Sequence, residues 1–160
     1  MRRVMLAVLV AVAVAACDSD SPTAPSPDPN VVTFRATLLA ANEVPAVTGP
    51  EATGRGNAVI TMRVDRDGSN NITGATFDFV VNLNSFPAGT KWTLAHIHEG
   101  GTGVAGGVRV NTGLTPTAAV VLSNGSVSNQ TFSGIRFTPA QRADAITHIT
   151  QMIANPGARW

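Results

Sequence analysis

Two histidines, separated by one residue, are the side chains of this sequence best suited to chemistry. His96 and His98 lie in the segment 94–101, an apolar stretch that runs directly into glycines. On a β-strand, side chains at positions i and i+2 project from the same face, about 6–7 Å apart. Two imidazoles placed in this way could bind a transition metal, or could hydrogen-bond within the domain and hold the glycine-rich loop.

The metal interpretation assigns zinc or copper to His96 and His98, with Glu99 as a weaker third candidate. A stable site usually needs about three or four protein ligands, and a single strand supplies two. Glu99 faces away from both histidines unless the strand ends at His98. The third histidine, His148, is expected on the partly exposed surface of a helix, remote from the pair. A structural role is therefore favoured, metal binding is the alternative, and no other cofactor is indicated.

Composition and motifs argue against several other functions. The formal net charge is +1, so nucleic acid is not an expected partner. The sequence contains no Walker loop, serine nucleophile elbow or dinucleotide-binding fingerprint placed between a strand and a helix. We therefore expect a protein without catalytic residues, that is, not an enzyme.

The elements that position the histidine pair are predicted to be β-strands. Apolar and polar side chains alternate with a period of two between residues 31 and 137, as in strands with one buried face. The predicted strands cover about 33–40, 58–65, 75–83, 92–98, 108–111, 117–122 and 130–137. The segment 65–71, rich in Asp, Asn and Gly, joins the second and third strands as a hairpin. This pattern predicts a mainly β domain, an antiparallel sandwich or barrel.

One helix is predicted near the C-terminus, over about 139–154. Thr138 and Pro139 are residue types preferred at the N-cap and at the first helical position. The Asn-Pro-Gly segment 155–157 is a strong stop signal. The apolar side chains that recur at helical spacing, and are expected to face the sheet, are Ile146, Ile149, Met152 and Ile153.

The first 30 residues are expected to export and anchor the chain. Residues 1–16 are a basic start and an apolar run shorter than the ~20 residues of a membrane span, as in a signal peptide. Small residues before Cys17, the only cysteine, resemble a bacterial lipobox, in which the cysteine is lipidated. An ordinary signal peptide ending at Ala-x-Ala is the alternative. Residues 17–30 then form a lipidated, proline-rich tether. We expect a membrane-anchored lipoprotein facing the periplasm or the cell exterior.

Four motifs of the folded part resemble the CHRD domain, a module named after the extracellular protein chordin. They are Asn42-Glu43-Val44-Pro45, Gly54-Arg55-Gly56-Asn57-Ala58, Ala95-His96-Ile97-His98 with the glycines that follow, and Ile153-Ala154-Asn155-Pro156-Gly157. The resemblance spans about 34–160 and makes residues 31–160 a CHRD-like β domain. It marks Glu43, Pro45 and Gly100 as family-motif residues beside the histidine pair. It implies a non-enzymatic, extracytoplasmic binding or structural module, with a ligand that it does not identify.

The resemblance also predicts that the domain lacks its last strand. In the CHRD domain the Asn-Pro-Gly turn leads into a final strand with a further histidine. This sequence instead reaches Trp160 directly after the turn. We therefore expect an incomplete domain with an unpaired sheet edge and a lower stability than the intact module.

Overall fold

Alternating side chains fold most of this chain into antiparallel strands. The computed structural model describes residues 28–101, 103–104, 106–137 and 142–156, so the predicted signal peptide and Cys17 lie outside the described residues. The strands are β1 (Val31–Leu39), β2 (Arg55–Arg66), β3 (Ile72–Asn84), β4 (Thr90–Trp92), β5 (His96–His98), β6 (Val108–Asn111), β7 (Val120–Leu122) and β8 (Val127–Ile135). The helical elements are the 3-10 turns η1 (Ala40–Asn42), η2 (Gly49–Thr53) and η3 (Pro116–Ala118), and the helix α1 (Arg142–Ala154).

The largest sheet has four antiparallel strands in the order β1-β2-β3-β8. Its inner face carries the alternate apolar side chains of β3, and Phe77 is fully buried opposite Met62 of β2. Side chains of the other parity, such as Arg35 and Asn57, are exposed. The predicted period of two with one wet face is confirmed, because each strand buries only one of its two faces.

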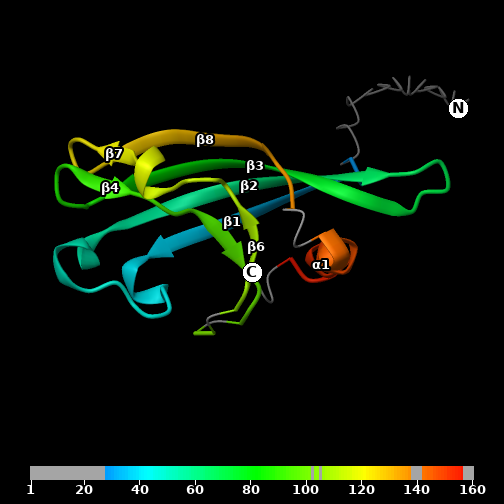
Figure 1. Cartoon of the computed structure of the whole chain (residues 1–160), viewed down its shortest axis with the longest axis horizontal. Coiled ribbons are helices and arrows are strands. Elements are labelled where there is room, and N and C mark those ends of the chain that lie inside the picture. The colour runs from blue at the N-terminus through cyan, green and yellow to red at the C-terminus, as the bar shows by residue number, and fades with distance from the viewer. Residues whose placement is uncertain (1–27, 102, 105, 138–141, 157–160) are drawn as a thin grey trace, which may run out of the picture.

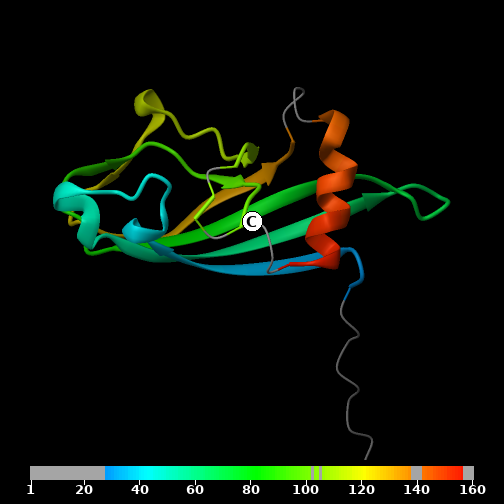
Figure 2. The same cartoon turned by 90° about the horizontal axis from the view of Figure 1, so that it is seen from below.

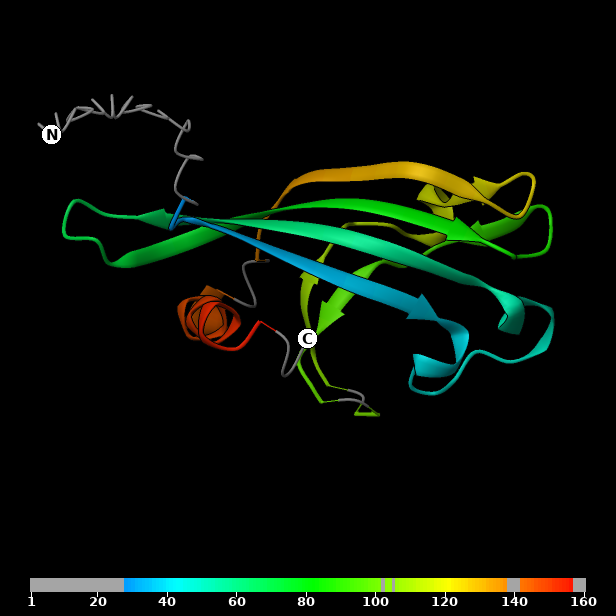
Figure 3. The same cartoon turned by 180° about the vertical axis from the view of Figure 1, so that it is seen from behind.

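A second layer covers the inner face of this sheet. The pairs β4–β7 and β5–β6, together with α1, lie on the same side of the long strands, and α1 runs across them (Figures 1 and 2). Seen from behind, α1 and β5–β6 lie side by side beneath the sheet (Figure 3). Ile97, Val110 and Ile149 supply buried side chains from this layer to one continuous core. The predicted mainly β fold with antiparallel sheets and one C-terminal helix is confirmed.

Most predicted strands differ from the observed ones by two or three residues at their ends, and two of them differ in kind. The strand expected over 92–98 is two strands, because β4 pairs with β7 whereas β5 pairs with β6. The strand expected over 117–122 is shortened to β7, because η3 occupies its start. The side chain of Thr115 caps η3 by accepting a hydrogen bond from the backbone N–H of Ala118.

The predicted hairpin between β2 and β3 is confirmed. The carboxylate of Asp67 accepts hydrogen bonds from the backbone N–H groups of Ser69 and Asn71, each at 2.9 Å. The side chain of Asn71 also donates to Asp67, and this bond is the main reason why the pKa of Asp67 lies below its usual value. The turn residues therefore satisfy the backbone of the hairpin locally.

The helix is present, and its predicted buried face is confirmed at Ile149, Met152 and Ile153 but wrong at Ile146. Ile146 is 50% exposed, whereas the side chains facing the sheet recur at i, i+3, i+4 and i+7, as Ala145, His148, Ile149 and Met152. His148, expected at the surface, is 5% exposed. The predicted N-cap and first helical position lie outside the described residues. Among the described residues no helix is both long and apolar enough to cross a bilayer.

The direction of β1 sets the two ends of the domain. β1 starts beside α1 and runs along the long axis to the opposite end (Figure 2). There η1, η2, β4 and β7 gather (Figure 1). The segment that follows β1 therefore lies at the end of the domain far from α1.

Candidate functional site

The two histidines of β5 lie against each other. Their ring centroids are 4.5 Å apart and the ring planes make an angle of 79°, an edge-to-face contact. In the pairing with β6, His96 lies opposite Asn111 and His98 opposite Val108, with a register shift between Ile97 and His98. The alternation of strand side chains thus brings the two imidazoles together, as the spacing predicts.

His98 closes the glycine-rich loop that follows it. Its Nδ1 lies 2.7 Å from the carbonyl oxygen of Gly106. Because a carbonyl oxygen only accepts, Nδ1 carries the hydrogen and donates it. The backbone N–H of Glu99 donates to the carbonyl oxygen of Gly107 at 3.0 Å, which closes the loop a second time. Only glycine fits at position 106, because the Cβ of any other residue would lie 1.3 Å from the Glu99 carbonyl oxygen.

Burial disfavours the charged form of His96. Burial lowers the pKa of His96 below its usual 6.5, and the neighbouring His98 lowers it further. The carboxylate of Glu43 acts in the opposite direction and raises this pKa. Glu43 belongs to the motif 42–45, so the structure brings that motif within electrostatic reach of the histidine pair.

The remaining motif residues have separate positions. The peptide bond between Val44 and Pro45 is cis. At Gly100 a Cβ would lie 3.0 Å from the carbonyl oxygen of Val104, so this glycine permits a close approach within the loop. Cys17, the predicted lipidation site, lies outside the described residues.

The side chain of Glu99 pairs with Arg109 rather than with the two histidines. Its Oε2 accepts from Nε of Arg109 at 2.9 Å and from Nη2 at 2.6 Å. Nδ1 of His148 lies 3.9 Å from the same oxygen. His148 was expected at the surface, but the helix buries it beside the carboxylate of Glu99, the residue that follows the histidine pair. The spacing of Ala145, His148 and Ile149 at i, i+3 and i+4 is the sequence signal that could have indicated the burial of His148.

The described residues do not assemble a metal site. Across 28–101, 103–104, 106–137 and 142–156, no group of three or more His, Cys, Asp or Glu side chains is arranged to hold a metal ion. His96 and His98 supply two imidazoles, and Glu99, the weaker third candidate, is paired with Arg109. The zinc or copper alternative therefore gains no support from the described part of the chain.

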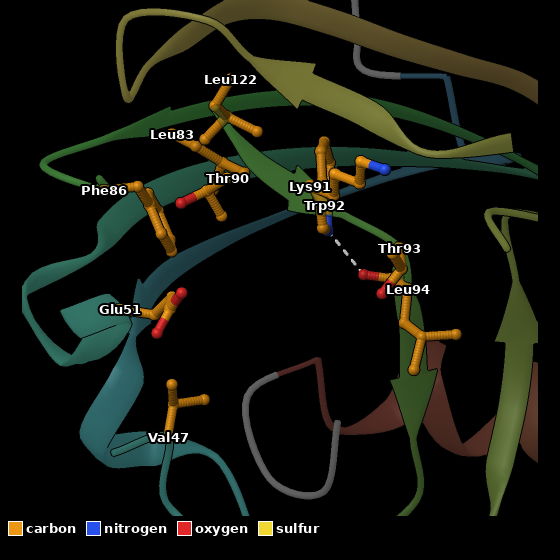
Figure 4. Close-up of a pocket in the computed structure, with 10 residues that line it drawn as sticks. All are labelled: Val47, Glu51, Leu83, Phe86, Thr90, Lys91, Trp92, Thr93, Leu94 and Leu122. Carbon is orange, nitrogen blue, oxygen red and sulfur yellow. Dashed lines mark hydrogen bonds between the residues drawn. The ribbon is translucent and has the colours of Figure 1, made fainter. Parts of the chain in front are cut away.

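A cavity of about 360 Å³ opens at the end of the domain far from α1. Its apolar lining comes from segments distant in the sequence, as Val47, Leu83, Phe86, Trp92, Leu94 and Leu122. Glu51 of η2 also lines it, and its carboxylate faces the open space (Figure 4). Sequence reasoning missed this cavity, because no single segment carries a pattern that indicates it.

The comparisons with known proteins identify one family. A family model of the CHRD domain matches residues 34–155. The match covers the motif 42–45, the histidine pair and α1. Neither the search of curated proteins nor that of solved structures finds a match to this chain. The matched range covers most of the chain, and this chain therefore belongs to the CHRD domain family.

Proposed function

We propose that this chain is a non-enzymatic, extracytoplasmic binding module, anchored to a membrane by lipid on Cys17. The observation that carries the proposal is how the signature residues are used. His98 donates to Gly106 and Glu99 pairs with Arg109, so these groups are engaged in contacts within the domain. Side chains held in this way shape a loop, which supports a structural role for the signature and leaves ligand binding to another surface.

The cavity beside η2 is the surface that supports a binding function. It is open at its rim, where Val47 is 40% exposed and Leu94 is 56% exposed. Its volume of about 360 Å³ falls within the range of small-molecule sites. Apolar walls with a small number of polar groups are typical of such sites.

The anchor rests on the order of the N-terminal residues. A basic start and an apolar run end at Cys17, and a segment with four prolines in thirteen residues precedes the first strand. That composition cannot form a core and indicates an extended connection between a lipid and the domain. The near-neutral domain offers little electrostatic attraction to anionic lipids, so an acyl chain on Cys17 would supply the membrane affinity.

Lipid labelling tests the anchor. The full chain is expressed in a bacterial host fed with alkyne-tagged palmitate, beside Cys17→Ser and the matched control Ser19→Ala. We expect label on the wild type and on Ser19→Ala, and none on Cys17→Ser. Added protease should also degrade the domain on intact cells, or on spheroplasts if the protein faces the periplasm.

Two outcomes would contradict the proposal. Label on Cys17→Ser equal to the wild type would remove the lipid anchor. Protection of the domain from protease in both intact cells and spheroplasts would remove the extracytoplasmic location.

A further inference from the structure

We infer that the cavity between η2 and β4 binds a small organic cation, a molecule with an apolar body and one protonated amine. This inference rests on the proposed function as a binding module and names the ligand class. It is carried by three observations, namely the apolar lining, the position of one carboxylate and the rigid placement of the aromatic rings.

The apolar lining favours a ligand with an apolar body. Leu83, Phe86 and Leu122 belong to the lining, and Leu83 and Leu122 are buried. Val47 and Leu94 line it from two different segments and remain exposed. A ligand that covers the exposed side chains of the lining removes apolar surface from water, which is the main favourable contribution to binding in such a site.

Glu51 supplies one negative charge to this apolar site. Its carboxylate faces the open space between the walls (Figure 4). Among the described residues it forms no side-chain hydrogen bond or ion pair. Lys91, the one cationic side chain among the residues that line the cavity, points away from Glu51 (Figure 4). A protonated amine would therefore gain a charge-assisted hydrogen bond without displacing an existing partner.

The aromatic walls are fixed before any ligand arrives. The indole N–H of Trp92 donates to the carbonyl oxygen of Leu94 at 2.5 Å, and its ring meets Phe132 edge to face at 5.5 Å. The Phe86 ring fills the space above Gly54, where a Cβ would lie 2.2 Å from it. Preformed walls lower the entropic cost of binding.

Three ligands with one common body separate the apolar and the ionic contributions. The probes are 2-phenylethylamine, 2-phenylethanol and phenylacetate, which carry a positive, a neutral and a negative head. The full-length lipidated protein is placed in phosphatidylcholine nanodiscs and titrated by calorimetry, with empty nanodiscs as the control for partition into lipid. We expect the amine to bind about tenfold more tightly than the alcohol, since hydrogen bonds to charged groups are the stronger ones. The acid should bind more weakly than the alcohol.

Two variants and one control locate the site. Glu51→Gln should bind the amine and the alcohol about equally, because it keeps the shape and removes the charge. Leu94→Ser, at an exposed rim position, should weaken all three ligands by a similar factor. Asp144→Asn, on α1 at the other end of the domain, makes the same change of charge and should bind like the wild type. Circular dichroism melting of each variant shows whether it is folded.

The outcomes separate this inference from the proposed function. Equal affinity of the folded wild type for amine and alcohol, or a preference that survives in folded Glu51→Gln, would overturn it. If Glu51→Gln does not fold, the other two variants decide. Weaker binding of the ligands by Leu94→Ser, together with an unchanged preference for the amine in Asp144→Asn, supports the site. Unchanged binding by Leu94→Ser overturns it. Failure of all three ligands to bind would also overturn it. Palmitate labelling and protease access would then still test the anchored module by themselves.

Discussion

Nδ1 of His148 on α1 lies 3.9 Å from Oε2 of Glu99, the residue that follows the signature histidines. The same carboxylate oxygen accepts two hydrogen bonds from Arg109, and the ring of His148 stacks on Phe137 with 6.4 Å between centroids. The helix thus meets the loop after β5 and strand β6 at one half-buried carboxylate. Glu99, Arg109 and His148 form one polar unit at this junction.

Removing Arg109 should destabilise this unit. Arg109→Met leaves Glu99 half-buried without its two donors, and we expect a loss of about 2 kcal/mol in the free energy of unfolding. Arg136→Met is the matched control, because the Arg136–Asp65 pair is far more exposed and should contribute about 0.5 kcal/mol. Urea unfolding measures both. Equal losses in the two variants would show that the Glu99 pair has no special structural role.

A methyl group at Gly106 should disrupt the loop, whereas one at Gly107 should not. The Cβ of Gly106→Ala would meet the Glu99 carbonyl oxygen at 1.3 Å, and Gly107→Ala would come no closer than 3.8 Å to Arg109. We expect Gly106→Ala to lose about 3 kcal/mol or more, with Gly107→Ala close to the wild type. Thermal midpoints of the two variants provide the comparison, and a tolerated Gly106→Ala would contradict the loop geometry.

Stability should fall below neutral pH because of His96. The pKa of His96 is lower in the folded protein than its usual 6.5, mainly through burial, so the unfolded chain binds a proton more readily. The stabilising contribution of neutral His96 is complete above 6.5 and is lost as the pH falls through the folded pKa. The thermal midpoint of the wild type should therefore drop more than that of His96→Asn between about pH 7.5 and about pH 5.

An NMR titration of the His96 ring tests the causes separately. Glu43 raises the pKa of His96, so Glu43→Gln should lower that pKa further. An unchanged pKa of His96 in Glu43→Gln would show that the carboxylate of Glu43 does not interact electrostatically with the histidine pair. Equal pH dependence of wild type and His96→Asn would remove His96 as the source of the stability change.

Removing the histidine pair should not change the affinity of the protein for zinc or copper. We expect the full chain and its His96→Ala/His98→Ala variant to bind either metal within about twofold of each other. The variant should nevertheless melt at a lower temperature, because it loses the bond from His98 to the Gly106 carbonyl oxygen. Metal affinity that disappears in a folded variant would restore the metal interpretation.

The sequence predicts the parts of this fold that depend on local pattern. Period-two alternation identifies β1, β2 and β3, and the Asp67 turn is recognised from residues that satisfy its backbone. The histidine contact follows from strand geometry alone. These features are set by neighbours within a few positions along the chain.

Features decided by tertiary packing escaped prediction. The split between β4 and β5 depends on two separate pairing partners, β7 and β6. The apolar pattern of the helix identified Ile149, Met152 and Ile153 correctly but misplaced the edge of the face, because the face that packs on β3 includes His148 and the small Ala145 rather than Ile146. The contact of His148 with Glu99 and the cavity beside η2 both join segments that no local pattern relates.

The direction of β1 decides how the domain would be presented to its surroundings. Its nine residues span about 30 Å at the rise of a strand, from the α1 end to the cavity end. The tether proposed for residues 17–30 would join the domain at its α1 end, so the point of attachment and the cavity would lie at opposite ends of the domain. The tether would then leave the entrance of the cavity uncovered.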